Sequence, residues 1–197
     1  LPNEDRDAAE LVQQSMGRDG VTVLCCGKDL RVEKVLDGKR LVVDSHGRHH
    51  DVTVDEILVG VGRAPNVQGL GLEKVGVNYD GKGIAVNDRL QTTNPRIYAA
   101  GDVCSRYKFT HAADAMAQIV IQNALFPHPF GLGYASVQSL NMPWCTFTAP
   151  EVAHVGLYEA EAAKQGLKVE TYTYKYDEVD RAILDGDEEG FARIHIQ

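Results

Sequence analysis

The fold of this chain is decided by Thr92-Thr93-Asn94-Pro95-Arg96-Ile97-Tyr98-Ala99-Ala100-Gly101-Asp102. Residues 96–100 are predicted to form a short buried strand that ends in Gly101-Asp102. A strand with this ending presents a carboxylate at its C-terminal edge, which is where open α/β sheets bind their ligands. The glycine permits a ligand to approach the backbone closely, and the carboxylate can accept hydrogen bonds from a sugar-like polyol. The alternative is that Asp102 only ends the strand and caps the next helix.

The next element is predicted to be an α-helix from Thr110 to Phe126, because apolar residues return there at helical spacing. Thr110 is assigned as its N-cap, and Asp114 is placed in its first turn, beside the positive end of the helix. The free N–H groups of that turn, near His111 to Ala113, would then point at an electron-rich atom of the same ligand.

A second buried strand is predicted upstream, at residues 56–61, because this run is continuously apolar, as in strands covered on both faces of a parallel sheet. It ends in Gly62-Arg63-Ala64-Pro65-Asn66, where glycine and proline force the chain out of the sheet. Before it, an amphipathic helix is expected at residues 5–18. Alternating runs between residues 21 and 54, with turn signals such as Asp37-Gly38, predict an antiparallel meander.

The last part of the chain has a different composition, which begins near Asn141 after a linker rich in proline and glycine. A strand is expected at residues 143–148, a helix at residues 157–165 and a further strand at residues 168–175. Residues 191–197 are also strand-like.

The composition is that of a soluble acidic protein. The 197 residues are 44% hydrophobic and 24% charged, with a formal net charge of −8 and a pI near 5.3. This charge disfavours nucleic acid and anionic membranes as partners, since both require a clustered basic surface. No apolar run approaches the roughly 20 residues that cross a bilayer, and residues 1–5 do not resemble a signal peptide. We therefore expect a cytoplasmic location.

No metal site is predicted. The cysteines at positions 25, 26, 104 and 145 lack the spacing of zinc ligands and are expected to be reduced thiols. Cys25-Cys26 is interpreted as part of a strand, with one side chain on each face, rather than as a redox couple. His46, His49 and His50 are expected to face solvent on a hairpin, because no cluster of cysteines or carboxylates supports them as ligands. Two other histidines and three alternating tyrosines are assigned to sheet surfaces: His154, His195, Tyr172, Tyr174 and Tyr176.

Three motifs carry a resemblance to a known family. The run from Thr92 to Asp102 resembles the second flavin-binding motif of the pyridine nucleotide-disulfide oxidoreductases, and residues 61–66 resemble the sequence that closes their NAD(P)-binding domain. Residues 143–151, followed by Val155-Gly156-Leu157, are similar to the opening of their interface domain. The motifs stand in the order of the family and span most of the chain. The resemblance is strongest to the group with the dihydrolipoamide dehydrogenases and mercuric reductase-like proteins.

The resemblance implies cofactor contacts but no catalytic residue in this chain. Asp102, after Gly101, would hold the ribityl and pyrophosphate region of FAD. The backbone of the next helix would stabilise negative charge at the pyrimidine edge of the flavin during reduction. Gly62 and Arg63 would line the passage between the nucleotide and flavin domains. The alternative for Arg63 is a surface salt bridge. The implied cofactor-binding residues are Gly62, Arg63, Gly101, Asp102, His111, Ala112 and Ala113.

The sequence also departs from the family pattern. It has no Gly-x-Gly-x-x-Gly loop, no Cys-x4-Cys pair and no C-terminal His-Pro. We therefore expect a fragment that begins after a nucleotide-binding βαβ unit and ends midway through the interface domain. Residues 1–62 would be the distal part of an NAD(P)-binding domain, 63–140 the distal part of an FAD-binding domain and 141–197 the first part of a dimerisation domain. The expected fold class is α/β, with three-layer Rossmann-like domains and an α+β interface domain.

The implied function belongs to the parent enzyme. There, electrons would pass from NAD(P)H through FAD to a disulfide or a metal ion, in a homodimer that serves cell redox homeostasis. The isolated chain is expected to be inactive, because it lacks the thiol pair. The alternative is a non-catalytic fragment that serves only as a folded binding or dimerisation module.

Overall fold

The computed structural model describes residue 1 and residues 3–197, which form two compact units. One unit comprises Leu1–Val59 and Pro143–Gln197, and the other comprises Gly60–Met142. The strands assigned in the described residues form one three-stranded and three two-stranded sheets, and every pairing is antiparallel. Among the residues described, no helix is long and apolar enough to cross a membrane.

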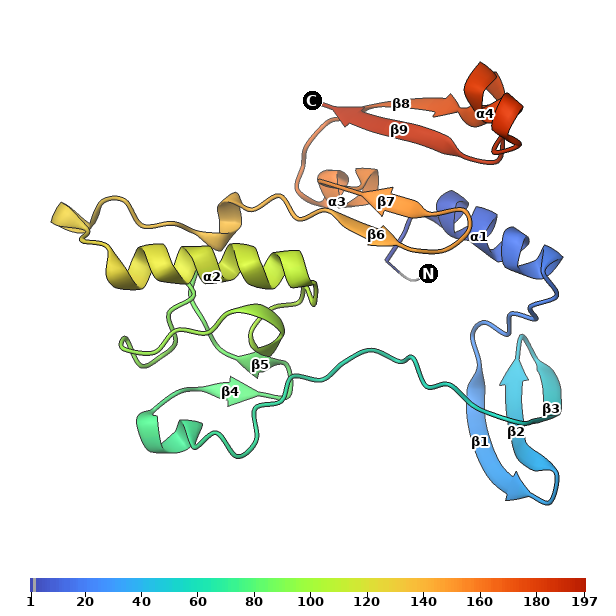
Figure 1. Cartoon of the computed structure of the whole chain (residues 1–197), viewed down its shortest axis with the longest axis horizontal. Helices are drawn as coiled ribbons and strands as arrows, with labels where there is room; N and C mark the ends of the chain where they lie inside the picture. The colour runs from blue at the N-terminus through green and yellow to red at the C-terminus, as the bar shows by residue number, and fades with distance from the viewer. Residues whose placement is uncertain (2) are drawn as a thin grey trace. The chain divides into compact units, whose positions relative to one another are not determined.

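The first unit begins with helix α1 (Arg6–Arg18), close to the range expected from its apolar spacing. Strands β1 (Lys28–Val35), β2 (Gly38–Ser45) and β3 (Arg48–Val54) then form the predicted meander (Figure 1). The first turn lies one residue earlier than expected, since Val35 pairs directly with Gly38. The second turn is His46-Gly47, whose φ angles of 49° and 74° are those of a type I′ hairpin.

The rest of the first unit contains two further hairpins. Strand β6 (Trp144–Thr146) pairs with β7 (Val152–His154), and β8 (Glu170–Lys175) pairs with β9 (Phe191–Ile196). Helix α3 (Glu159–Lys164) lies between the two hairpins in sequence, and α4 (Asp180–Asp185) connects β8 to β9. The three strands and the helix expected in this region are confirmed, whereas β7 and α4 were not predicted.

Polar contacts tie the beginning of the first unit to its end. The carboxylate of Glu4 accepts hydrogen bonds from Trp144 Nε1 at 3.0 Å and Thr146 Oγ1 at 3.2 Å. The guanidinium of Arg193 on β9 pairs with both Asp5 and Asp7 at the start of α1. The segments before and after the central unit therefore form one folded body.

The second unit packs short elements around two apolar clusters. Its elements are the 3-10 turns η1 (Leu72–Val75), η2 (Gly101–Val103), η3 (Pro129–Gly131) and η4 (Val137–Ser139), strands β4 (Tyr79–Asp80) and β5 (Gly83–Ile84), and helix α2 (Thr110–Leu125). One cluster includes Val77 and Ile84, and the other joins Leu90 to Met116 and Ile119 of α2. Helix α2, labelled in Figure 1, contacts η2 and is the helix predicted from residue 110.

The prediction of buried strands at residues 56–61 and 96–100 is wrong. No strand is assigned to either run, and Leu58 is 97% and Val61 89% exposed. The backbone of residues 96–100 pairs with nearby residues of the same loop, through an isolated bridge between Tyr98 and Gln91 and hydrogen bonds that include Ala99 N to Leu90 O at 3.0 Å and Thr92 N to Ile97 O at 2.9 Å. A parallel strand needs hydrogen-bonding partners on its edges, and the described residues supply no such ladder to these runs.

Candidate functional site

The candidate site is built around Gly101, which follows the extended residue Ala100. Gly101 is buried and has φ of 76°, a left-handed conformation that favours glycine. A Cβ atom at this position would lie 3.1 Å from Cβ of Ala113, so the missing side chain lets the turn approach α2 closely. The sequence thus brings the 101–103 turn against the beginning of the helix.

Asp102 lies in this 3-10 turn at the end of an extended run, rather than at the end of an assigned strand. Its side chain is exposed, and its main-chain carbonyl accepts a hydrogen bond from Lys108 Nζ at 2.9 Å. Within residues 3–197 no donor lies within hydrogen-bonding distance of the Asp102 carboxylate. The carboxylate is therefore available to accept hydrogen bonds from a ligand.

The start of α2 differs from the prediction in its cap. Phe109 is the N-cap and Thr110 the first helical residue, so the assignment of Thr110 as N-cap is wrong by one position. Asp114 is not in the first turn, and its carboxylate accepts a hydrogen bond from Gln118 one turn later, at 2.8 Å. A phenyl ring cannot accept from the first N–H groups, which have no acceptor within an α-helix. The helix end thus lacks the side-chain cap that the sequence suggested.

The backbone at the start of α2 lies close to Asp102 in sequence and packs on its turn. Ala112 is fully buried, and the N–H of Ala113 donates to Phe109 O at 3.0 Å. The N–H of Ala113 therefore already has an acceptor within the protein. His111 is exposed, and its ring stacks on Phe109 with 5.3 Å between the ring centroids.

The thiol next to this turn is not a nucleophile at neutral pH. Cys104 is partly buried, and its Sγ donates to Gly101 O at 3.6 Å. Burial raises the pKa of the Cys104 thiol to about 11, although the positive charge of Lys108 opposes the shift. Because thiolates rather than thiols react, Cys104 has a packing role beside the site.

Gly62 and Arg63 lie near the beginning of the second unit, in an irregular segment. Both residues are exposed, and Gly62 has φ of 100° with open space around its Cα. Arg63 forms no ion pair with another described residue. Their assignment to a passage for the nucleotide stays a prediction, as do the three domain boundaries.

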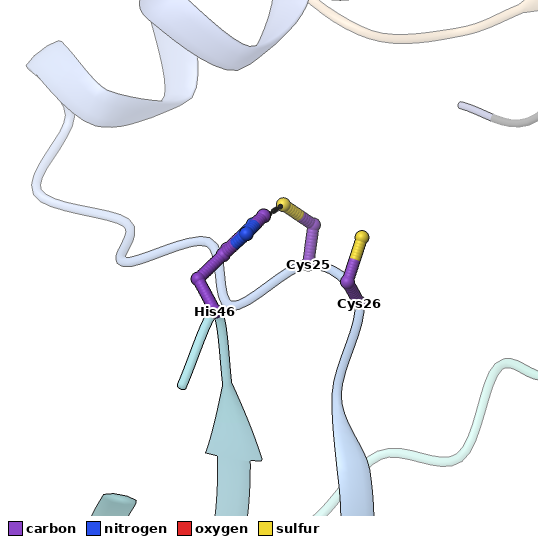
Figure 2. Close-up of side chains that lie close together, drawn as sticks. All are labelled: Cys25, Cys26 and His46. Atoms are coloured by element: carbon purple, nitrogen blue, oxygen red, sulfur yellow. Dashed lines mark hydrogen bonds between the residues drawn. The ribbon is translucent and has the colours of Figure 1, made fainter. Parts of the chain in front are cut away.

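A second group of reactive side chains was missed from the sequence. Figure 2 shows Cys25 and Cys26 in the loop before β1, with His46 beside them in the turn between β2 and β3. Cys25 Sγ lies 3.0 Å from His46 Nε2. The interpretation of Cys25-Cys26 as part of a strand is wrong, because β1 begins only at Lys28 and both thiols are exposed.

The histidine prediction is partly corrected by this group. His46 and His49 are exposed as expected, whereas His50 is half-buried. The expectation that no cysteines support His46 as a ligand is wrong. The structure shows why the group was missed: the register of β1 and β2 shifts between Lys28 and Arg31, so that Lys28 pairs with Asp44. Continuing the antiparallel pairing by two residues then places Cys26 opposite His46.

Comparison with known proteins covers nearly the whole chain. Residues 1–117 match a family model described as pyridine nucleotide-disulphide oxidoreductase, and residues 142–197 match the dimerisation domain of the same proteins. The chain is 34% identical over 197 residues to a dihydrolipoyl dehydrogenase of Thermus scotoductus, covering 98% of this chain and 41% of that protein. It is 32% identical over 191 residues to a mercuric reductase of Staphylococcus aureus, covering 96% of this chain and 34% of that protein.

Solved structures agree with these matches. The HOCl-induced flavoprotein disulfide reductase RclA from Escherichia coli superposes with a TM-score of 0.82 at 27% identity, covering 100% of this chain and 44% of that one. LpdA from Mycobacterium tuberculosis also gives a TM-score of 0.82, at 26% identity, with 100% and 41% covered. The likeness confirms the α/β, Rossmann-like fold class. The chain spans about a third to two fifths of the length of these relatives.

Proposed function

The chain belongs to the pyridine nucleotide-disulphide oxidoreductase family, and we propose that the longer protein it represents passes electrons from NAD(P)H through FAD to a disulfide or a metal ion. The observation that carries the proposal is the exposed, unpaired Asp102 carboxylate beside the close approach of Gly101 to α2. This combination pairs an acceptor for ribityl hydroxyls with a helix N-terminus that favours negative charge.

The residues present fit the flavin half of FAD. The exposed Asp102 carboxylate can accept hydrogen bonds from a ligand without displacement of a protein donor. The buried Gly101 fixes the turn against α2, so the helix end keeps a constant position relative to the carboxylate. When bound, FAD would supply the two-electron relay between nicotinamide and substrate. The dipole at His111 to Ala113 would stabilise negative charge at the pyrimidine edge without any movement of the protein.

The remaining parts of the proposal concern the nucleotide and the partner subunit. Gly62 and Arg63 would line the passage by which NAD(P)H reaches the flavin, with the Arg63 guanidinium available to a phosphate or carboxylate group. Residues 142–197, which match the dimerisation domain, would pair with a second copy of the protein. The 197-residue chain lacks a Cys-x4-Cys pair, so by itself we expect it not to oxidise NAD(P)H.

Asp102→Ala in the full-length protein tests the proposal. A hydrogen bond to a charged group contributes about 1.5–3 kcal/mol, so the loss should weaken FAD binding by about 10- to 100-fold. Flavin absorbance per protein after gel filtration measures the occupancy. Asp114→Ala is the matched control, because that carboxylate contacts only Gln118 along the same helix.

Two results would contradict the assignment. If both variants retained as much FAD as the unmodified protein, Asp102 would not be part of the flavin site. If the unmodified full-length protein were a colourless dimer, the alternative of a non-catalytic dimerisation module would replace the enzyme.

A further inference from the structure

The first unit carries a cluster of soft metal ligands at one end of its meander. One ligand atom each from Cys25, Cys26 and His46 lies within 4.8 Å of the other two. All three side chains are exposed, and Figure 2 shows the two sulfur atoms and the imidazole gathered at the end of β2. Among the described residues this is the one such group of histidine, cysteine and carboxylate side chains.

The fold holds the cluster in place from both sides. On β2, the buried hydroxyl of Ser45 donates to Cys25 O at 2.7 Å, which fixes the cysteine backbone beside the neighbouring His46. After the cysteines, Gly27 packs so closely that a Cβ there would lie 3.0 Å from Val43 Cγ2. The loop before β1 is therefore attached to β2 on each side of Cys26.

The backbone of the cluster is also unusual. Cys26 has φ of 56° and His46 has φ of 49°. The type I′ turn explains the value at His46. Cys26 lies in no such turn, and the left-handed conformation is strained for a residue with a side chain. Such strain is found preferentially at ligand-binding positions, and here it accompanies the placement of both thiols beside one imidazole.

We propose that Cys25, Cys26 and His46 bind a thiophilic d10 cation, Zn²⁺ or Cu(I), with a coordination position left open to solvent. Thiolates and imidazole are the ligands that these ions prefer. Donors on one tetrahedral zinc lie roughly 3.5–3.8 Å apart, from Zn–S and Zn–N bonds of about 2.3 and 2.0–2.1 Å. In the cluster, Cys25 Sγ and His46 Nε2 are 3.0 Å apart, and all three ligand atoms lie within 4.8 Å of one another. The separation expected around zinc falls within this range. The group contains no carboxylate, which disfavours Mg²⁺ and Ca²⁺.

Binding is an exchange of protons for metal. Two S–H bonds break, two metal–sulfur bonds form and two protons pass to solvent, while His46 binds as neutral imidazole through Nε2. No electron is transferred. Because the three protein ligands are exposed, the fourth position of a tetrahedral ion is left to water or to an external thiol.

Zn²⁺ binding to the metal-free, reduced chain tests the proposal. The chain is titrated against a chromophoric chelator, and we expect one competing site per chain. Cys25→Ser, Cys26→Ser and His46→Ala should each lower the affinity by at least about tenfold, since loss of even a supporting group around a metal costs 10- to 100-fold. Cys145→Ser and His49→Ala are the matched controls and should retain the affinity. A parallel titration with Cu(I) decides which ion binds more tightly.

Two further readouts separate ligation from folding. Co²⁺ in place of Zn²⁺ should give a sulfur-to-cobalt absorption that disappears in Cys25→Ser and Cys26→Ser. Far-ultraviolet circular dichroism should be unchanged in all variants, because the three side chains are exposed. The proposal is overturned if neither ion binds the unmodified chain more tightly than Cys25→Ser, or if Cys145→Ser loses as much affinity as Cys25→Ser. No flavin or NAD(P)H enters the assay, so its outcome is independent of the proposed electron transfer.

Discussion

Replacement of Gly101 by alanine tests how the chain builds its proposed flavin site. Two costs are expected. At φ of 76° an alanine occupies the left-handed region, which costs about 1–2 kcal/mol. In addition, its Cβ meets Cβ of Ala113 at 3.1 Å, and overpacking of this kind typically costs about 1–3 kcal/mol. The free energy of unfolding should therefore fall by about 2–5 kcal/mol.

The two contributions can be separated by controls that the chain itself offers. Gly76 has φ of 67° and open space around its Cα, so Gly76→Ala should show the backbone cost of about 1–2 kcal/mol alone. Ala113→Gly should cost about 1 kcal/mol through helix propensity. In the double variant Gly101→Ala/Ala113→Gly the close contact is absent. The double variant should then be more stable than the sum of the single effects by about 1–3 kcal/mol.

Urea unfolding monitored by circular dichroism measures all four variants. Effects at independent sites add within about 0.3–0.5 kcal/mol. Additivity within that margin for Gly101→Ala and Ala113→Gly would show that the turn does not press against α2, and the close approach argued for the site would be refuted. In the full-length protein, Gly101→Ala should also lower FAD occupancy, because the displaced turn moves Asp102 away from the helix end.

Two stability predictions concern other parts of the chain. The ion pair with Arg193 lowers the pKa of Asp7 below its ordinary value of 3.8, so its stabilisation is present above that value and is lost as pH falls through the lowered folded-state pKa. The difference in urea midpoint between the unmodified chain and Arg193→Met should therefore disappear in that acid range, and an equal difference at neutral and acid pH would contradict the pairing. Leu90 is 2% exposed and packs against Met116 and Ile119 of α2, so Leu90→Ala should lower the free energy of unfolding by about 2–5 kcal/mol. Leu125, which is 76% exposed, provides the control, because Leu125→Ala should change that free energy little.

Elements whose signal is local were predictable from the sequence. The apolar spacing of residues 110–126 and 5–18 defines one face of a helix within a few turns, and both helices are found. The meander was predictable because two-residue turns fix the pairing of adjacent strands. The N-cap of α2 could not be predicted from the sequence. Thr110 and Phe109 are adjacent, and only the extended backbone of Phe109 in the structure identifies it as the N-cap.

Elements that depend on distant partners were not predictable in this chain. Residues 56–61 and 96–100 have the apolar composition of buried parallel strands, but strand hydrogen bonds come from neighbouring strands rather than from composition. In the described residues, the backbone partners of the second run all lie in the preceding loop, at residues 90–94, rather than in a neighbouring parallel strand. The same apolar side chains that a complete sheet would cover are exposed here, as at Leu58.

The cysteine and histidine cluster shows how a site can be missed when spacing alone is examined. Cys25 and His46 are separated by 21 positions, and neither lies in a motif of metal ligands. The pairing of β1 with β2 brings the loop before one strand beside the turn after the other, and histidine is one of the few residues with a side chain that enters the left-handed region readily. An asparagine at position 46 would form the same turn but would offer no soft ligand. His46→Asn should therefore preserve the hairpin and abolish Zn²⁺ binding, which isolates the imidazole as the ligand rather than the fold around it.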